Sequence, residues 1–297
     1  MAERDEWKAA GDEPKEISGA ELPEALRGYT GFLLRRVYAR FAAEALADDP
    51  QSRDFVVLDA LADQDAHSQA EVAERLGINR TIMVRLLDRL EAAGYVTRAR
   101  NPANRRSYVL SLTPEGRAAR DAMRPSVSAH DDRITAGLTA QEKRRFDALL
   151  SRLLPAPDHP AVRSTAYLVA QAHYRMRRGG DDRLAATGLR ARHFGPLAAI
   201  DQLGPCPQSR LAHYLAITEP AAAEVVDELV KAGLVVRGRD PQDRRRYALE
   251  LTDLGRQRLD VLRAGVDELQ AEVVAALGAD DEAELRALLT KLLPVKG

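Results

Sequence analysis

The sequence has one cysteine, no long hydrophobic run and no excess of charge of either sign. Cys206 alone cannot form an internal disulfide or a multi-thiolate zinc site, so a secreted disulfide scaffold is excluded and a reducing, cytoplasmic compartment is expected. The 44 Lys and Arg residues against 45 Asp and Glu give a net charge of −1. Any nucleic-acid site must therefore be a local basic patch. The 297 residues, 45% of them hydrophobic, suffice for two globular domains.

Sequence signatures of catalysis are also lacking. The chain contains no Walker loop, dinucleotide fingerprint, nucleophile elbow or paired-carboxylate motif, so we expect no enzyme activity, no cofactor and no metal site. Residues 1–21 contain seven acids, three bases and no apolar run. They are predicted to form an acidic, disordered tail rather than a signal peptide or membrane anchor, and no membrane partner is expected.

The most informative feature that is present is an internal duplication. Residues 69–117 align without a gap with residues 208–256, at an offset of 139, and 20 of the 49 pairs are identical. The same offset brings Phe55 onto Phe194, and the ending Leu-Leu-Pro of residues 153–155 onto that of 292–294. This register predicts two copies of one domain, 22–154 and 161–297. The linker 155–160 holds three prolines, and the seven steps from residue 154 to 161 span at most roughly 23 Å.

Each copy has the pattern of a winged helix-turn-helix, a mainly α fold with a small β-hairpin wing. In copy one, helical periodicity covers 24–47 and 55–62, and Ser68 is a candidate cap for a short helix. A longer helix is expected over 80–93, after a cap at Asn79. Strand-forming residues at 95–100 and 107–112 indicate a hairpin, and Thr113 with Pro114 indicates the start of another long helix. A last helix is expected over 140–154.

The helix over 80–93 has the two faces that insertion into a DNA major groove requires. An apolar stripe faces the domain, while Thr81, Val84, Arg85 and Asp88 point the other way. Residues 80–107 carry seven arginines against two acids, a local charge of +5. Double-stranded DNA is therefore the expected partner, bound by phosphate and base-edge contacts. The DNA-binding candidates of copy one are Asn79, Arg80, Thr81, Val84, Arg85, Arg98, Arg100, Asn104, Arg105 and Arg106.

Both copies resemble MarR-type transcriptional regulators. The resemblance rests on NPANRRSYVLSLTPEGR (101–117) and DPQDRRRYALELTDLGR (240–256), with further similarity over 188–217, and it covers residues from about 25 to 297. It implies a DNA-binding regulator, usually a repressor, that pairs through its terminal helices and binds near-palindromic operators. It also implies a possible small aromatic or phenolic effector, or regulation by cysteine oxidation.

If the family's pairing mode applies, the two copies form a fused pseudo-dimer with pseudo-two-fold symmetry. The two recognition helices would then lie roughly 34 Å apart, one turn of B-DNA. A rival arrangement is self-association, in which copy one pairs with copy one of a second chain and copy two serves assembly or ligand sensing. The sequence does not choose between the two arrangements.

Copy two has diverged on the outward face of its recognition helix, where it carries Pro220, Ala223, Glu224 and Asp227. Residues 219–246 hold six bases and six acids, so this segment has no net charge. We therefore expect copy one to be the main base reader. Copy two is expected to contribute mainly phosphate and minor-groove contacts through its wing residues Arg237, Arg239, Arg244, Arg245 and Arg246. The alternative is a sensing or dimerising protein in which copy two, or both copies, no longer contacts DNA.

The remaining candidates are weaker. His173, Tyr174, His193 and Phe194 could line an effector pocket in copy two. Cys206, beside a predicted helix start, could have a lowered thiol pKa and act as a redox sensor, although a lone cysteine is more often an inert apolar residue. We expect a solvated helix face for His130, Asp131 and Asp132, a loop at Gly179 and Gly180, and ordinary surface charge for Arg35 and Arg36.

Overall fold

The computed structural model describes residues 23–48, 52–62, 67–76, 80–101, 104–154, 164–239 and 247–293. The expected tail 1–21, the linker 155–160, Gly77 and Asn79 lie outside these ranges. The described chain is mainly helical, with small antiparallel hairpins, as the sequence predicts. It divides into two compact units, one formed by Glu44–Arg175 and the other by the chain up to Ala43 together with Met176–Gly297.

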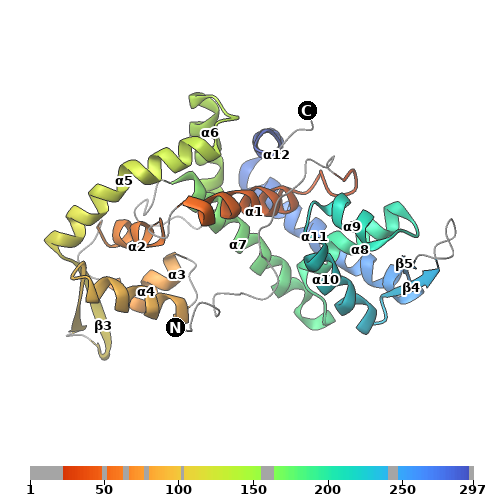
Figure 1. Cartoon of the computed structure of the whole chain (residues 1–297), viewed down its shortest axis with the longest axis horizontal. Coiled ribbons are helices and arrows are strands. Elements are labelled where there is room, and N and C mark those ends of the chain that lie inside the picture. The colour runs from red at the N-terminus through yellow and green to blue at the C-terminus, as the bar shows by residue number, and fades with distance from the viewer. Residues whose placement is uncertain are drawn as a thin grey trace. The chain divides into compact units, whose positions relative to one another are not determined.

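The unit Glu44–Arg175 contains the predicted winged helix-turn-helix of copy one (Figure 1). Its strand order is β1-β3-β2, so a short strand that the sequence did not predict joins the hairpin. Helix α5 packs against α2, and Figure 1 shows the two helices next to each other. The complete elements are α2 (Ser52–Ala62), β1 (His67–Ser68), α3 (Gln69–Arg75), α4 (Arg80–Ala92), β2 (Val96–Asn101), β3 (Asn104–Leu112), α5 (Pro114–Ile134) and α6 (Ala140–Leu153).

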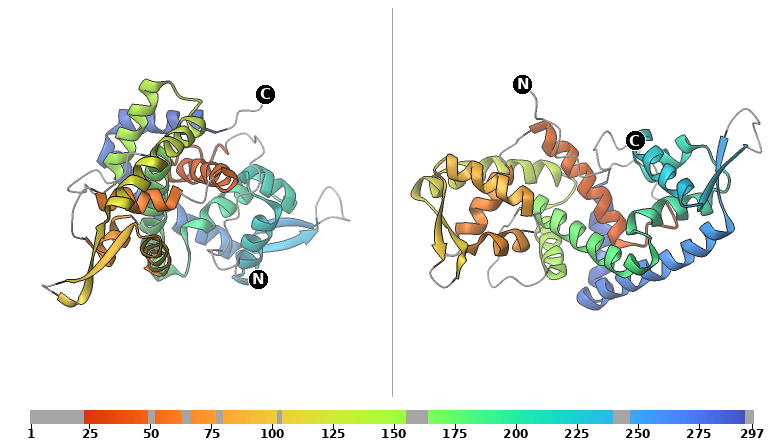
Figure 2. Two further views of the ribbon diagram at one scale, coloured as in Figure 1. Left: turned by 60° about the vertical axis from the view of Figure 1, so that its left-hand side comes forward. Right: turned by 90° about the horizontal axis from the view of Figure 1, so that it is seen from below.

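The other unit contains the second winged helix-turn-helix, and Figure 2 shows its hairpin β4–β5 extending from the helices. In place of a third strand it has a single bridge between Cys206 and Leu249. Its complete elements are η1 (Ala185–Thr187), η2 (Ala191–His193), α8 (Phe194–Leu203), α9 (Gln208–Leu215), α10 (Glu219–Lys231), β4 (Val235–Arg239), β5 (Tyr247–Leu251), α11 (Asp253–Leu277) and α12 (Ala279–Lys291).

The compact units do not coincide with the sequence copies, because the first helix of each copy packs with the other copy. Helix α1 (Thr30–Asp48) begins copy one, yet as far as Ala43 it belongs to the unit that holds α8–α12. Helix α7 (Thr165–Leu184) begins copy two, yet as far as Arg175 it belongs to the unit that holds α2–α6. The two copies have therefore exchanged the beginnings of their first helices.

Each wing is joined to the helix that follows it by the same threonine–glycine motif. Thr113 Oγ1 accepts a hydrogen bond from Gly116 N at 2.9 Å and donates one to the Gly94 carbonyl at 2.8 Å. Thr252 repeats these bonds with Gly255 and Gly233. A Cβ atom at Gly255 would lie 2.0 Å from the Leu234 carbonyl oxygen. The Leu-Thr-x-x-Gly motif therefore permits a close backbone crossing at the base of the wing.

In the unit Glu44–Arg175, the N-terminus of α7 fits into what we call the aspartate socket, formed by Asp131 of α5 and by Lys143 and Asp147 of α6. The Asp131 carboxylate accepts hydrogen bonds from Thr165 N at 2.9 Å and Ala166 N at 3.1 Å. Thr165 Oγ1 donates to Asp147 at 2.8 Å. Asp131 is buried, so the expectation of a solvated face there is wrong. Its carboxylate is needed to satisfy buried N–H groups at a helix start.

In the other unit, the N-terminus of α1 fits into the glutamine socket, formed by Gln270 of α11 and by Glu282 and Arg286 of α12. Thr30 N donates to Gln270 at 3.0 Å, and Thr30 Oγ1 donates to Glu282 at 2.6 Å. Glu282 also accepts from Arg286 Nε at 2.8 Å. Burial raises the pKa of Glu282, but the hydrogen bonds from Arg286, Thr30 and Gln270 outweigh it, so this pKa lies below its ordinary value.

The prediction of a loop at Gly179 and Gly180 is also wrong, since both residues lie inside α7. A Cβ atom at Gly180 would lie 2.9 Å from the Ala191 side chain, and one at Gly179 would lie 3.4 Å from Leu269. The two glycines thus let α7 pack closely against its neighbours within the helix, despite their low helix propensity.

We predict that Gly255→Ala lowers the free energy of unfolding by about 1–3 kcal/mol, because the added methyl group meets a backbone carbonyl that cannot move alone. Gly238→Ala in the same wing is the matched control, since a Cβ atom there meets nothing within 4 Å. Urea unfolding of both variants measures the difference. Equal midpoints for the two variants would contradict the close crossing.

We predict that the aspartate socket makes stability depend on pH. Burial, with the nearby charge of Asp131, raises the pKa of Asp147 from 3.8 to about 6. Between these values the native state binds more protons than the unfolded chain, so this carboxyl lowers stability as the pH rises through that range. Asp147→Asn keeps an acceptor for Thr165 and should raise the melting temperature at pH 7.5 but not below pH 4. Asp182→Asn, at an exposed position of α7, is the control and should leave the profile unchanged.

Candidate nucleic-acid interface

Helix α4 presents the outward face that the sequence predicts. Met83 and Leu87 are fully buried in the core of the unit. Thr81, Val84 and Arg85 are exposed on the opposite side. The outward face of α4 is therefore formed by exposed side chains. The backbone of Arg80 begins the helix, but the position of its side chain, like the whole of Asn79, lies outside the description.

The hairpin β2–β3 is joined to α4 by ion pairs on Arg98. Arg98 Nη2 donates to Asp88 at 2.5 Å, and its Nε lies 3.2 Å from Glu91, without hydrogen-bond geometry. Arg98, a predicted DNA contact, therefore holds the wing against the recognition helix in this structure. A phosphate would have to share its guanidinium with these carboxylates.

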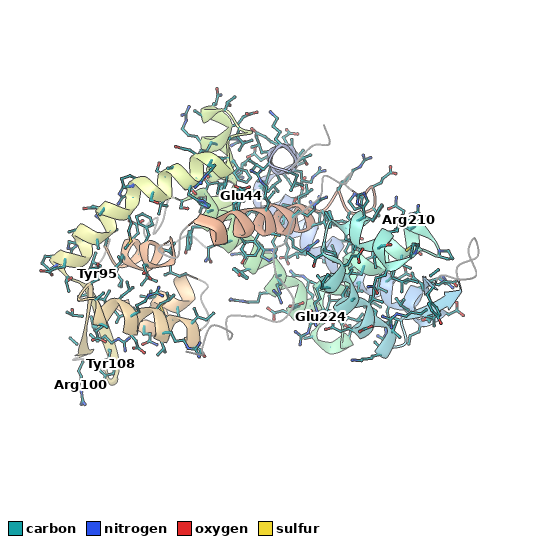
Figure 3. The ribbon with its side chains drawn as sticks, viewed as in Figure 1. Glu44, Tyr95, Arg100, Tyr108, Arg210 and Glu224 are labelled. Carbon is teal, nitrogen blue, oxygen red and sulfur yellow. The ribbon has the colours of Figure 1, made fainter. Side chains whose placement is uncertain are left out.

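Further along the hairpin, Arg100 is exposed, and Figure 3 shows its side chain extending away from the ribbon. Arg100 pairs in register with Tyr108 of β3, and the strands are irregular between Arg100 and Asn101. The backbone of Asn104, Arg105 and Arg106 forms the start of β3, while their side chains are not described.

Two exposed tyrosines beside the wing tips were missed by the sequence argument, which used them only as strand markers. Tyr108 is 49% exposed and Tyr247 is 72% exposed, unusually high values for aromatic side chains in strands. They occupy equivalent positions at the offset of 139. The signal in the sequence is the repeated pattern Arg-Arg-x-Tyr at 105–108 and 244–247. Both rings have a hydroxyl group and an apolar face that fit the sugar–phosphate edge of a groove.

Helix α10 has the same architecture with a different outward face. Thr218 caps it by accepting a hydrogen bond from Ala221 N at 3.3 Å. Pro220, Glu224 and Asp227 are exposed (Figure 3 labels Glu224). Asp227 accepts a hydrogen bond from Arg237 of β4, which lowers the pKa of Asp227. The surface that corresponds to Arg85 and its neighbours therefore carries negative charge.

The bond between Arg237 and Asp227 corresponds to that between Arg98 and Asp88 at the offset of 139. Both copies thus fix the wing to the recognition helix through the same pair. Arg237 was predicted to contact DNA, and here it shares its charge with a carboxylate, as Arg98 does. The side chain of Arg239 and all of Arg244, Arg245 and Arg246 lie outside the described part of the chain.

Comparison with known proteins identifies the family. A sequence profile of the MarR family matches residues 51–108 and 190–247, once in each copy. The repressor NicR of Pseudomonas putida is 32% identical over 133 residues, which cover 43% of this chain and 84% of NicR. The chain belongs to the MarR family. The repressor Rv2887 of Mycobacterium tuberculosis is 35% identical over 127 residues, or 41% of this chain and 91% of Rv2887. The structure of the repressor CouR on a DNA duplex covers 44% of this chain and 92% of CouR, with 28% identity and a TM-score of 0.41.

The four residues predicted to line an effector pocket in this MarR-family chain fall into two pairs. His173 is buried beside Tyr174, with ring centroids 5.3 Å apart, in the unit Glu44–Arg175. His193 and Phe194 belong to the other unit, where Phe194 packs edge-on against Tyr29. A pocket shared by all four residues is therefore not part of either unit, and their ligand role stays a prediction.

His193 connects the start of α8 to the recognition helix of its unit. Its Nδ1 accepts a hydrogen bond from Arg190 N at 3.2 Å, so Nε2 carries the proton that points to Glu228 at 3.3 Å. Burial lowers the pKa of His193, although Glu228 opposes this shift. Glu228 is also bound by Arg192 at 2.7 Å. These contacts give His193 a structural role.

The redox reading of Cys206 is wrong for this structure. Cys206 is fully buried, and its backbone bonds to Leu249 hold it at the edge of the wing. Burial raises the pKa of its thiol, the opposite of what a reactive cysteine requires. Cys206 therefore fits its other reading, as an inert apolar residue.

Arg36 is not the surface charge expected from the sequence. It is 2% exposed, and its Nε and Nη1 atoms have no hydrogen-bond partner among the described residues. Burial and the neighbouring Arg35 lower the pKa of Arg36 to about 10.

In the described parts of the chain no group of side chains has metal-binding geometry, and no helix is both long and apolar enough to span a membrane.

Proposed function

We propose that the protein is a DNA-binding transcriptional repressor in which copy one reads base sequence and copy two mainly contacts the DNA backbone. The observation that supports this division is the difference between two equivalent helix faces. Helix α4 exposes Thr81, Val84 and Arg85, whereas α10 exposes Pro220 and Glu224. An arginine can donate two hydrogen bonds to guanine, while a glutamate at the equivalent place repels phosphate.

The exchange of first helices supports a fused pseudo-dimer. In each compact unit, the terminal helices of one copy hold the first helix of the other copy. One chain then supplies both winged helix-turn-helix domains, and its operator need not be palindromic because the two reading helices differ. Its action is equilibrium binding, and we assign it no catalytic step.

The alternative function is that copy two serves ligand sensing or assembly and does not touch DNA. The exposed acids Glu224 and Asp227 of α10 favour this alternative over base reading by copy two. The wing of copy two favours DNA contact instead, because five arginines and an exposed Tyr247 lie along it in the sequence. The effect of charge changes on α10 therefore separates the two functions.

We predict opposite effects on DNA binding when the charge is removed at two equivalent positions, Arg85 of α4 and Glu224 of α10. Arg85→Ala should weaken binding to the selected operator by about 1–3 kcal/mol and relax its specificity, because a base-edge contact is lost. Glu224→Gln should strengthen binding if α10 approaches phosphate, and should have no effect if copy two is a sensor. Fluorescence anisotropy with an operator obtained by selection from random DNA measures both affinities.

The exposed Asp182→Asn variant serves as the control for a change of net charge alone. The slope of affinity against salt should be close to −0.9 for each phosphate contacted. If affinity is unchanged in Arg85→Ala, α4 does not read bases. Two equal inverted half-sites in the selected DNA would also contradict the unequal roles of the copies.

We further propose that a small anionic effector binds at Arg36. A buried guanidinium with two nitrogens that find no partner among the described residues is costly, and a bound carboxylate would remove that cost. Counted from the threonine at each helix start, Thr30 and Thr165, the residue of α7 equivalent to Arg36 is Gln171, and its amide already donates to the Leu76 carbonyl. The chain would therefore bind one such effector rather than two.

We predict that benzoate raises the melting temperature of the wild-type chain, whereas the neutral benzamide does not. Arg36→Gln, which installs the residue found in α7, should abolish the benzoate effect without lowering the stability of the free protein. Differential scanning fluorimetry measures both. The same benzoate effect in Arg36→Gln would show that the anion binds elsewhere.

A further inference from the structure

The aspartate and glutamine sockets occupy equivalent positions in the two copies but carry different charges. At the offset of 139, Asp131, Lys143 and Asp147 correspond to Gln270, Glu282 and Arg286. The sign of the charge is reversed at the second and third of these positions. Each socket nevertheless holds a fully buried threonine at a helix start, Thr165 in one and Thr30 in the other. The sockets are therefore alike in geometry and unlike in chemistry.

The two first helices differ at the residue just before this threonine. Ser164 precedes Thr165, and its Oγ donates to Asp131 at 3.0 Å, so the carboxylate accepts three hydrogen bonds in all. Tyr29 precedes Thr30, and its hydroxyl donates to Asp267 at 2.7 Å. The residue that corresponds to Asp267 in copy one is Ser128. The residue before each threonine, which we call the cap residue, therefore has an acidic acceptor only in the opposite copy: Tyr29 in copy two and Ser164 in copy one.

Pairing of like copies would break both matches. With α1 in the aspartate socket, Tyr29 would replace Ser164, and the buried Asp131 would lose one of its three donors. The Tyr29 hydroxyl would face Ser128 in place of Asp267. With α7 in the glutamine socket, Asp267 would lose the hydrogen bond from the Tyr29 hydroxyl. Ser164 would face Gln270 in place of the Asp131 carboxylate. A buried carboxylate that loses a donor is destabilised, because it has already given up its hydration.

We propose that the pairs Tyr29–Asp267 and Ser164–Asp131 form a pairing code that directs each first helix to the opposite copy of the same chain. The code disfavours the rival assembly, in which copy one pairs with copy one of a second chain. The interaction surface formed by the terminal helices therefore accepts copy one with copy two, and in this structure both belong to one chain. This inference concerns assembly and does not depend on DNA binding.

Exchange of the two halves of the code in the full-length chain tests this proposal. The cap exchange Y29S/S164Y swaps the two donor residues and so breaks both pairs. The socket exchange S128D/D131Q/D267S/Q270D swaps the acceptor residues instead and breaks the same two pairs. Each should lower the melting temperature by several degrees or shift the mass from one chain of 32.6 kDa to two. The combined variant restores both matches and should recover the melting temperature and the single-chain mass. Differential scanning calorimetry and multi-angle light scattering give the two readouts.

The combined variant keeps the test decisive even if an exchange alone fails to fold. Tyr29→Phe removes only the hydroxyl bonded to Asp267, so it should lower the melting temperature by less than the cap exchange does. Recovery in the combined variant supports the code, because independent sites would give additive losses. Additive losses would overturn it, as would a cap exchange that keeps the wild-type melting temperature and mass. A wild-type mass of two chains would overturn pairing within one chain.

Discussion

The structure depends on how two buried helix starts are satisfied. The first N–H groups of a helix have no partner inside the helix, so a helix that begins in a protein interior needs acceptors from elsewhere. Thr30 and Thr165 are both fully buried at such starts. In each case the acceptors come from the last two helices of the other copy. Neither first helix could begin where it does without them, and the exchange of helices follows from this need.

Within each copy, the recognition helix and the wing form one element with two anchors. The threonine–glycine junction fixes the base of the wing, and an arginine–aspartate pair fixes its strand to the helix. Both anchors recur at the offset of 139. The duplication has therefore kept the contacts that hold the reading elements in place, while the exposed residues, such as Arg85 and Glu224, have become different. Two copies with one framework can in this way present two different surfaces to a ligand.

Local patterns predicted the local structure well. The cap at Ser68 is present, where Ser68 Oγ and the Glu71 carboxylate exchange hydrogen bonds with each other's backbone N–H groups. The outward face of α4 and the presence of the hairpin also follow from spacing alone. What failed depends on residues distant in sequence. Asp131 looks like a solvated acid and Arg36 like a surface base until the helices that bury them are known, because helical periodicity describes one helix and not its neighbours.

The charge distribution gives the difference between copies a physical consequence. The chain as a whole is almost neutral, and on the proposed function its attraction to DNA is attributed to the segment 80–107, which carries +5, rather than to 219–246, which carries no net charge. A polyanion is therefore attracted by the positive electrostatic potential of the segment in copy one, and the corresponding segment of copy two attracts it little. Encounter through copy one would place α4 at the groove first. The wing of copy two would then be brought to adjacent phosphates by its connection to copy one, which makes its contribution to binding an effect of proximity.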